Sequence, residues 1–179
     1  GYLRSLINHA PKLGISDIVI PCVDQSSLRS PEETARFVAV LESVLDDAEF
    51  YGVNLSLETD LNPDSFVQLL DRFSSPRVTV NYDIGNSSSL GYDPREELAA
   101  YGSKISCIHI KDRIKGGGSV VLGTGSADFE VFFDALQAHN YKGFFIMQAY
   151  RDDEGVDIFS RQLSWIRPYI EAYGARIRA

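Results

Sequence analysis

Residues 78–112, VTVNYDIGNSSSLGYDPREELAAYGSKISCIHIKD, decide the fold that this sequence predicts. The runs at 78–84 and 105–111 are apolar and have the length of buried strands. Between them, Asp93 is followed by Pro94 and two glutamates, a pattern typical of a helix N-terminus. A strand, a helix and a second strand in this order predict a βαβ unit with parallel strands.

The same alternation extends over the rest of the chain, with short connections. Further strands are expected at residues 17–23, 53–59 and 144–150. Helices are expected from Ser30 to about Phe50 with Gly52 ending it, from Asn62 to about Phe73, from Asp93 to Tyr101, from Asp128, and over 156–173 with a bend at Pro168. Five βα units predict an α/β fold, with one parallel sheet and residues 1–179 as a single domain.

Composition and charge exclude several classes of protein. The formal net charge of −8 repels nucleic-acid backbones, so we expect no nucleic-acid partner. No apolar run reaches the length of a membrane span, and no signal peptide is visible. Cys22 and Cys107 lie in apolar runs, which favours free thiols in a reducing compartment over a disulfide. We therefore expect a cytoplasmic protein without a membrane partner.

Alternation along each strand predicts which side chains share a face of the sheet. The polar-bearing faces are 54, 56 and 58; 79, 81 and 83; 107, 109 and 111; and 144, 146, 148 and 150. Near its carboxyl end, each of the four strands therefore carries a polar side chain: Glu58, Asp83, His109 and Gln148.

These four groups predict a metal site, because the carboxyl ends of neighbouring parallel strands meet at one edge. Two carboxylates facing a common axis repel one another unless a cation lies between them. Two carboxylates, an imidazole and an amide oxygen suit one divalent ion, with Mn²⁺ first and Mg²⁺, Co²⁺ or Zn²⁺ behind it. The alternative interpretation is a buried polar network without a metal.

Several motifs in the chain resemble one enzyme superfamily. The motifs are SLET at 56–59, NYDIGN at 81–86, IHIKD at 108–112, LGTGSADF at 122–129 and YKGFFIM at 141–147. In this order they resemble the xylose-isomerase-like sugar isomerases and epimerases. Residues 79–112 are most similar to the L-ribulose-5-phosphate (L-xylulose-5-phosphate) 3-epimerases.

The resemblance implies a (β/α)₈ TIM barrel with one divalent metal at its carboxyl rim. It implies that Glu58, Asp83, His109 and position 148 hold the metal, and that Glu58 and position 148 are the acid/base pair. It further implies proton transfer next to the carbonyl of a ketose or ketose phosphate, through an enediolate. We therefore expect an isomerase or epimerase of carbohydrate metabolism.

Two departures from the family pattern leave alternatives open. Gln148 stands where the family has glutamate, and an amide cannot accept a proton at neutral pH. A degenerate barrel that binds a sugar or a partner chain without turnover is therefore one alternative. An enzyme like the inosose dehydratases or hydroxypyruvate isomerases is another.

The second departure is length, because a complete barrel needs about 250 residues. The five units align with barrel strands 4–8, so we expect an N-terminally truncated barrel. Its open sheet edges predict coverage by a missing segment or by a second copy in a homo-oligomer.

The remaining candidates are predicted to bind substrate. Asn86 follows Asp83 by three residues, and Lys111 and Arg113 follow His109. Gly123 and Gly125 belong to the glycine-rich segment KGGGSVVLGTGS, whose amides are expected to hold a phosphate. The alternatives are a loop cap for Asn86, a solvated lysine at 111, and a flexible lid for the glycine-rich segment.

Overall fold

The computed structural model describes residues 1–148, 150 and 155–177. Ala149, which the sequence places in the last strand, lies outside the described residues. The chain divides into two compact units. Unit 1 comprises Gly1–Asn81 and Lys104–Cys107, and unit 2 comprises Tyr82–Ser103 and Ile108–Ala179.

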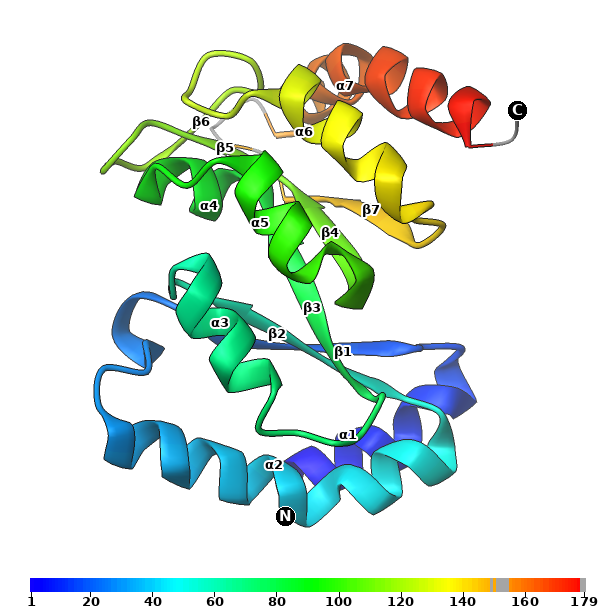
Figure 1. The fold of residues 1–179 in the computed structure, drawn as a ribbon. Coiled ribbons are helices and arrows are strands. Elements are labelled where there is room, and N and C mark those ends of the chain that lie inside the picture. The colour runs from blue at the N-terminus through cyan, green and yellow to red at the C-terminus, as the bar shows by residue number, and fades with distance from the viewer. Residues whose placement is uncertain (149, 151–154, 178–179) are drawn as a thin grey trace. The chain divides into compact units, whose positions relative to one another are not determined.

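Unit 1 is built from helices and parallel strands, coloured blue to green in Figure 1. Its elements are α1 (Tyr2–His9), β1 (Asp17–Cys22), α2 (Pro31–Tyr51), β2 (Asn54–Thr59), α3 (Pro63–Leu70), and the first residues of β3 (Val78–Asp83) and of β4 (Ile105–Ile110). Strand β1 pairs with β2 from Asp17↔Asn54 to Cys22↔Thr59, and β2 pairs with β3 from Leu55↔Val78 onward. Both pairings are parallel, as the sequence predicts.

The predicted ends of the long helix α2 are confirmed. The Ser30 hydroxyl accepts a hydrogen bond from the Glu33 amide, and Pro31 is the first helical residue. Gly52 ends the helix with φ +68°, a conformation that L side chains rarely adopt. Together these residues fix where the chain leaves α2 and enters β2.

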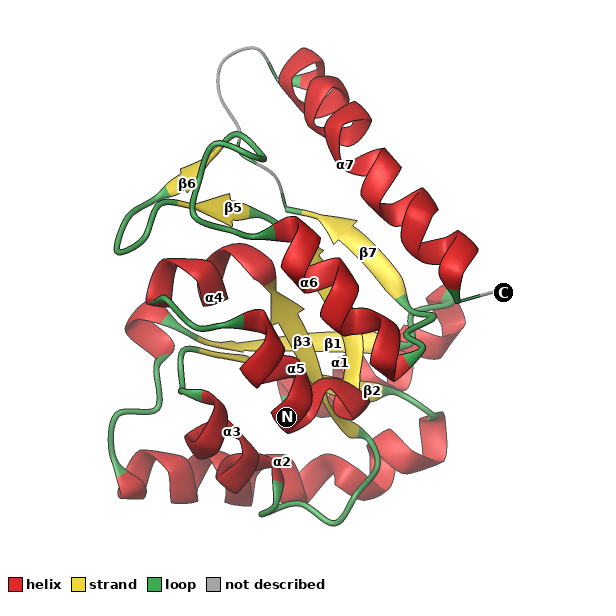
Figure 2. Cartoon of the chain, turned by 45° about the horizontal axis from the view of Figure 1, so that its top comes forward, coloured by secondary structure: helices red, strands yellow, loops and turns green. Residues whose placement is uncertain are grey.

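Unit 2 contains the remaining elements. They are α4 (Ile84–Leu90), α5 (Pro94–Tyr101), β5 (Asp112–Arg113), β6 (Ser119–Val120), α6 (Phe129–Leu136), β7 (Phe144–Met147) and α7 (Val156–Arg176), with the last residues of β3 and β4. Helix α6 lies between α5 and α7 in Figure 2. Its Phe133 ring stacks on Tyr169 and also contacts Tyr173, both from α7. This aromatic packing holds the last two helices together.

Five strands have the order β1-β2-β3-β4-β7 in one parallel sheet. The five strands predicted from the sequence are therefore confirmed. Strands β5 and β6 form a separate antiparallel hairpin with Asp112 opposite Val120. The candidate site residues stand at the carboxyl ends of their strands: Glu58 near the end of β2 in unit 1, and Asp83 and His109 near the ends of β3 and β4 in unit 2.

Four details differ from the prediction. Helix α4 and the β5–β6 hairpin were not predicted, and α3 ends at Leu70 rather than near Phe73. Helix α7 continues through Pro168 to Arg176. Within the described part of the chain, every helix is too short or too polar to span a bilayer.

Candidate metal centre and substrate site

In unit 1, Glu58 stands in β2 one residue before its end, and its side chain is buried. Its Oε2 accepts a hydrogen bond of 2.9 Å from Nδ2 of Asn81, which lies on the neighbouring strand β3. Leu55 and Leu57, on the opposite face of β2, are fully buried. Alternation along β2 therefore places the carboxylate as predicted, and Asn81 orients it.

Burial and nearby negative charges in unit 1 affect the pKa of the Cys22 thiol. Burial, together with the negative charges of Asp60 and Glu58, raises the pKa of Cys22 to about 11. Both cysteines are free and buried, so the expectation of structural thiols is confirmed. The thiol of Cys22 stays protonated at neutral pH.

In unit 2, Asp83 ends β3 and caps the next helix. Its Oδ1 accepts a hydrogen bond of 2.8 Å from the Asn86 amide, at the start of α4. Its Oδ2 is buried and has no hydrogen-bond partner among the described residues. His109 Nδ1 lies 3.8 Å from Oδ2 and Lys111 Nζ lies 3.5 Å from it, both beyond ordinary hydrogen-bond length. One buried oxygen of Asp83 is therefore left for a further partner, which the chemistry of a carboxylate requires to be a cation or a donor.

His109 is buried near the end of β4, beside Asp83. Strict alternation would put Ser106 on the opposite face of β4 from His109. However, Ser106 Oγ lies 2.7 Å from Thr79 Oγ1 and 2.7 Å from Ser56 Oγ, which are on the polar face. Strand β4 therefore departs from regular alternation between Ser106 and His109.

A group of polar side chains surrounds Asn86 in unit 2. Lys111 Nζ donates to Asn86 Oδ1 at 3.2 Å and to Gln148 Oε1 at 3.3 Å. Arg113 Nη1 donates to the same Asn86 oxygen at 2.9 Å. Gln148 is exposed, just after β7. Four of the predicted site residues therefore lie together: Asn86, Lys111, Arg113 and Gln148.

The glycine-rich segment binds a carboxylate of the chain itself. The amides of Gly123 and Gly125 donate to Asp112 Oδ2 at 3.0 and 2.8 Å, and the amide of Ala127 donates to Oδ1 at 3.1 Å. The expectation that the Gly123 and Gly125 amides hold a substrate phosphate is therefore corrected, because both are already used by a buried carboxylate. A Cβ on Gly125 would overlap Asp112 Oδ1, so only glycine fits there.

A second buried carboxylate that the sequence did not single out is Glu97 on α5. It accepts hydrogen bonds from Tyr82 Oη at 2.6 Å, from Tyr101 Oη at 2.8 Å and from the Ser87 hydroxyl. Burial raises the pKa of Glu97. Because Tyr82 and Ser87 flank Asp83, these hydrogen bonds fix the backbone on both sides of the candidate ligand.

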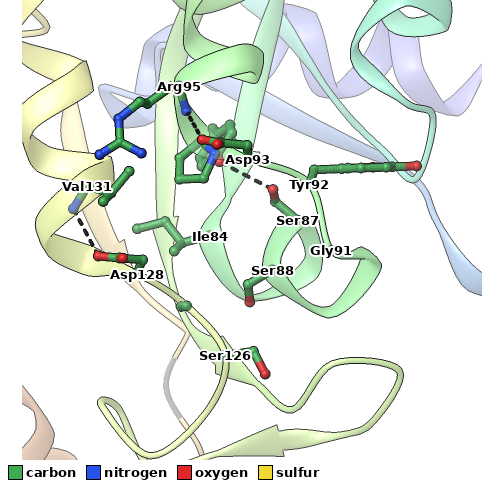
Figure 3. A pocket seen from close by; sticks show the side chains of 13 residues that line it. Ile84, Ser87, Ser88, Gly91, Tyr92, Asp93, Arg95, Ser126, Asp128 and Val131 are labelled. Carbon is green, nitrogen blue, oxygen red and sulfur yellow. Dashed lines mark hydrogen bonds between the residues drawn. The ribbon is translucent and has the colours of Figure 1, made fainter.

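A pocket of about 280 Å³ opens in unit 2, lined by parts of α4, α5 and α6. Figure 3 shows Asp93 and Asp128 in it, each accepting a hydrogen bond from a backbone amide at a helix start, and the extended side chain of Arg95. The predicted metal ligands and substrate-binding residues are not among its lining residues. We therefore place the candidate site at Asp83 and His109 and not in this pocket.

In unit 2, Asp83 and His109 are a buried carboxylate and a buried imidazole, with His109 Nδ1 3.8 Å from Asp83 Oδ2. The unused oxygen of Asp83 is the observation that fits a cation beside these two residues. Two carboxylate oxygens and an imidazole nitrogen are ligands that Mn²⁺ and Zn²⁺ accept.

Three relatives carry names of carbohydrate enzymes. SgbU of Haemophilus influenzae, whose assigned name is that of an L-ribulose-5-phosphate 3-epimerase, is 30% identical over 96% of this chain and 65% of its own length. The inosose dehydratase of Geobacillus thermodenitrificans is 24% identical over 84% of this chain and 58% of its own. The L-ribulose-5-phosphate 3-epimerase UlaE of Salmonella paratyphi A is 29% identical over 84% and 55%. The chain thus spans between 55% and 65% of the length of these curated relatives.

Solved structures share the fold. A xylose isomerase domain protein from Planctomyces limnophilus superposes with a TM-score of 0.81 and 21% identity, over 97% of this chain and 66% of that one. The IOLI protein, solved with a zinc atom, superposes with a TM-score of 0.76 and 19% identity, over 94% and 69%. At these identities the likeness concerns the fold alone, and it confirms the predicted TIM-barrel type.

The family model described as xylose isomerase-like TIM barrel matches residues 2–169. This match covers the strands of the sheet and the helices between them. The chain belongs to the family of xylose isomerase-like TIM barrels.

Proposed function

We propose that this chain supplies the metal-binding rim of an enzyme that epimerises or isomerises a ketose or a ketose phosphate. The reaction is proton transfer at a carbon next to the carbonyl. The observation that carries the proposal is the buried Asp83 Oδ2, which has no hydrogen bond and lies beside His109. Relatives named L-ribulose-5-phosphate 3-epimerases support the reaction class.

We propose Glu58, Asp83 and His109 as ligands of one divalent ion, with Mn²⁺ as the first candidate. When bound, the ion supplies Lewis-acid stabilisation of the negative charge that develops on the substrate oxygens. The amide oxygen of Gln148 is a further candidate ligand. Since that oxygen accepts a hydrogen bond from Lys111, Gln148 would have to exchange this partner to join the site.

Glu58 is the proposed base that removes the proton. The hydrogen bond from Asn81 Nδ2 holds its carboxylate in one orientation, which favours transfer along a fixed direction. Gln148 occupies the position of the second member of the acid/base pair that the resemblance implies. Its amide neither accepts nor returns a proton. A water molecule or a neighbouring group therefore has to return the proton to the opposite face of the substrate.

Two other functions retain specific support. Gln148 favours a barrel that binds a sugar without turnover, because the side chain at this position is neutral and hydrogen-bonded to Lys111. The related inosose dehydratase supports a dehydration as the other alternative, because loss of water from a ketone also begins with removal of a proton next to the carbonyl.

Hydrogen exchange tests the proposal directly. The chain is incubated with Mn²⁺ and a ketopentose or its phosphate in D₂O, and NMR follows deuterium at the carbons next to the carbonyl. We expect exchange in the natural chain and loss of at least about 100-fold of its rate in Glu58→Gln.

Restoring a carboxylate at position 148 distinguishes a slow enzyme from a protein that binds a sugar without turnover. Gln148→Glu is expected to raise the exchange rate by about 10- to 1000-fold, whereas Gln68→Glu, an exposed glutamine on α3, is the matched control. Absence of exchange in both the natural chain and Gln148→Glu would remove the enzymatic proposal and favour the binder.

A further inference from the structure

The carboxylate of Glu97 connects the two segments of the chain that meet at Asp83. Oε2 of Glu97 accepts a hydrogen bond of 2.6 Å from the Tyr82 hydroxyl and a second one from the Ser87 hydroxyl. Tyr82 directly precedes Asp83 in β3, and Ser87 lies in α4, the helix that Asp83 caps. A single oxygen atom of α5 therefore links the end of β3 to the helix that follows it.

Glu97 lies in a buried group of hydroxyl side chains. The glutamate is 3% exposed, and its three partners, Tyr82, Ser87 and Tyr101, are buried as well. Burying a carboxyl group costs free energy that an apolar side chain at the same position would not cost. Hydrogen bonds depend on direction, which apolar contacts do not, so this arrangement fixes the geometry of the groups that it joins.

The ring of Tyr82 is fixed together with its hydroxyl group. It stacks on Phe132 of α6, with the ring centroids 5.2 Å apart and the planes 15° from parallel. Side chains alternate along a strand, so those of Tyr82 and Asp83 point to opposite faces of β3. The position of the Tyr82 side chain therefore determines the direction in which Asp83 leaves the strand.

The direction of Asp83 matters because both of its oxygens have a defined place. Oδ1 accepts the hydrogen bond of 2.8 Å from the Asn86 amide, and Oδ2 lies 3.8 Å from His109 Nδ1. A movement of the junction between β3 and α4 would shift Oδ2 relative to the imidazole. Groups that orient a ligand from behind affect the affinity for a metal without touching it.

We propose that Glu97 is a positioning residue for the candidate ligand Asp83. Acting through Tyr82 and Ser87, Glu97 holds the junction of β3 and α4. The junction in turn keeps Asp83 Oδ2 beside the imidazole of His109. The effect on a metal rests on the proposed function, whereas the hold on the junction is tested without metal.

Two tyrosines that donate to the same carboxylate provide a matched pair of variants. Tyr82→Phe removes the hydrogen bond that joins Glu97 to β3. Tyr101→Phe removes a hydrogen bond of 2.8 Å that stays within α5, because Tyr101 lies one turn after Glu97. Each variant loses one buried hydroxyl group, and urea denaturation measures the stability that each loses. A difference between them in other properties therefore depends on where the lost hydrogen bond leads.

Hydrogen exchange of the Asn86 amide, followed by NMR in the metal-free chain, is the first test. This amide reports how firmly Asp83 caps α4. We expect Tyr82→Phe to raise its exchange rate at least about 10-fold, and Tyr101→Phe to change it by less than about two-fold. Equal exchange rates in the two variants would overturn the proposed hold of Glu97 on the junction.

Binding of Mn²⁺, followed by electron paramagnetic resonance, is the second test. Tyr82→Phe and Ser87→Ala, which each remove one link to Glu97, should weaken binding about 10- to 100-fold. Tyr101→Phe should bind Mn²⁺ as the natural chain does. A role of Glu97 in stability alone predicts no such difference, so equal affinities in Tyr82→Phe and Tyr101→Phe would contradict the positioning of a metal ligand.

The two tests also separate this inference from the proposed function. If the natural chain binds no Mn²⁺ although exchange of the Asn86 amide responds to Tyr82→Phe, the proposed metal site fails and the hold of Glu97 on Asp83 stands. If Mn²⁺ binds equally well to the natural chain and to Tyr82→Phe, the metal site stands and the positioning role fails.

Discussion

Asp83 and Asp112 are two buried carboxylates of unit 2 whose hydrogen bonds differ: Asp83 ends β3, and Asp112 begins β5 two residues after the end of β4. The side chain of Asp112 accepts three backbone hydrogen bonds, which use both of its oxygens. Asp83 uses Oδ1 to cap α4 and keeps Oδ2 buried without a hydrogen bond. Their residues are 4% and 0% exposed, so burial does not distinguish them.

The difference teaches that the partners of a buried acid indicate its role better than its place in the sheet. Three amides stabilise the charge of Asp112 within the fold, as a nest of N–H groups stabilises an anion. Asp83 lacks such compensation and instead lies beside an imidazole and an ammonium group. Asp112 therefore organises the hairpin, and Asp83 is the candidate ligand.

The largest effect is expected for Asp112→Ala. Removing this carboxylate leaves the amides of Gly123, Gly125 and Ala127 without their acceptor, so the free energy of unfolding should fall by about 3–5 kcal/mol. Urea denaturation measures this change, with Asp71→Ala at an exposed position as the control. A loss below about 1 kcal/mol would show that the hairpin does not depend on Asp112.

Glu97 adds a buried carboxylate to the comparison of Asp83 with Asp112, and its hydrogen-bond partners are hydroxyl groups. Burial raises its pKa, and the nearby negative charge of Asp93 raises it further. A raised pKa means that the unfolded chain releases this proton at lower pH than the folded chain does. The stability due to the protonated Glu97 is therefore complete below the unfolded pKa and is lost as the pH rises through the folded pKa.

Glu97→Gln removes this titration and keeps one of the two acceptor oxygens, which serve the hydroxyl groups of Tyr82 and Tyr101. Above the unfolded pKa of glutamate, near 4.3, the free energy of unfolding of the natural chain should fall relative to that of the variant, by up to about 1.4 kcal/mol per pH unit. Urea denaturation at several pH values from about 4 to about 8 measures it. Parallel pH profiles of the two proteins would contradict the raised pKa.

The smallest change in stability is expected for Asp83→Asn without metal. Asparagine keeps an oxygen that can cap α4, and the unsatisfied charge of Oδ2 is removed. The free energy of unfolding should change by less than about 1 kcal/mol, whereas the same substitution at Asp112 should cost about 1–3 kcal/mol. If Asp83→Asn destabilises the metal-free chain as much as Asp112→Asn does, Asp83 is a structural acid and the comparison fails.

Local sequence patterns predicted the strands and most helix ends because their causes are local. Ser30, Asn62, Asp93 and Asp128 each accept a hydrogen bond from an amide in the first turn of the helix that follows. Alternation also placed Glu58 on the face opposite the buried Leu55 and Leu57.

Helix α4 was missed because its sequence, IGNSSSL, is rich in glycine and serine, which favour loops. Its ends carry signals that could have revealed it. Asp83 caps the first turn through the Asn86 amide, and Gly91 ends the helix with φ +82°. The sequence interpretation treats this acid as a metal ligand alone, whereas its Oδ1 caps α4 and its Oδ2 has no hydrogen bond.

The β5–β6 hairpin and the face of Ser106 depend on contacts between distant residues. The hairpin segment is held by Asp112 across 11 to 15 positions of the chain, which no local pattern records. Ser106 follows the hydroxyl groups of Ser56 and Thr79 rather than strict alternation along β4. The roles of Gly123, Gly125 and Ser106 could therefore be read only from the structure.

The metal site remains the central proposal, and a manganese titration followed by electron paramagnetic resonance tests it most directly. The natural chain should bind one Mn²⁺ ion at a tight site, and His109→Ala should weaken that site by at least about 100-fold. His9→Ala, at an exposed histidine of unit 1, should bind as the natural chain does. Binding of Mn²⁺ that is absent, or equal in the natural chain and in His109→Ala, would contradict the proposed metal site.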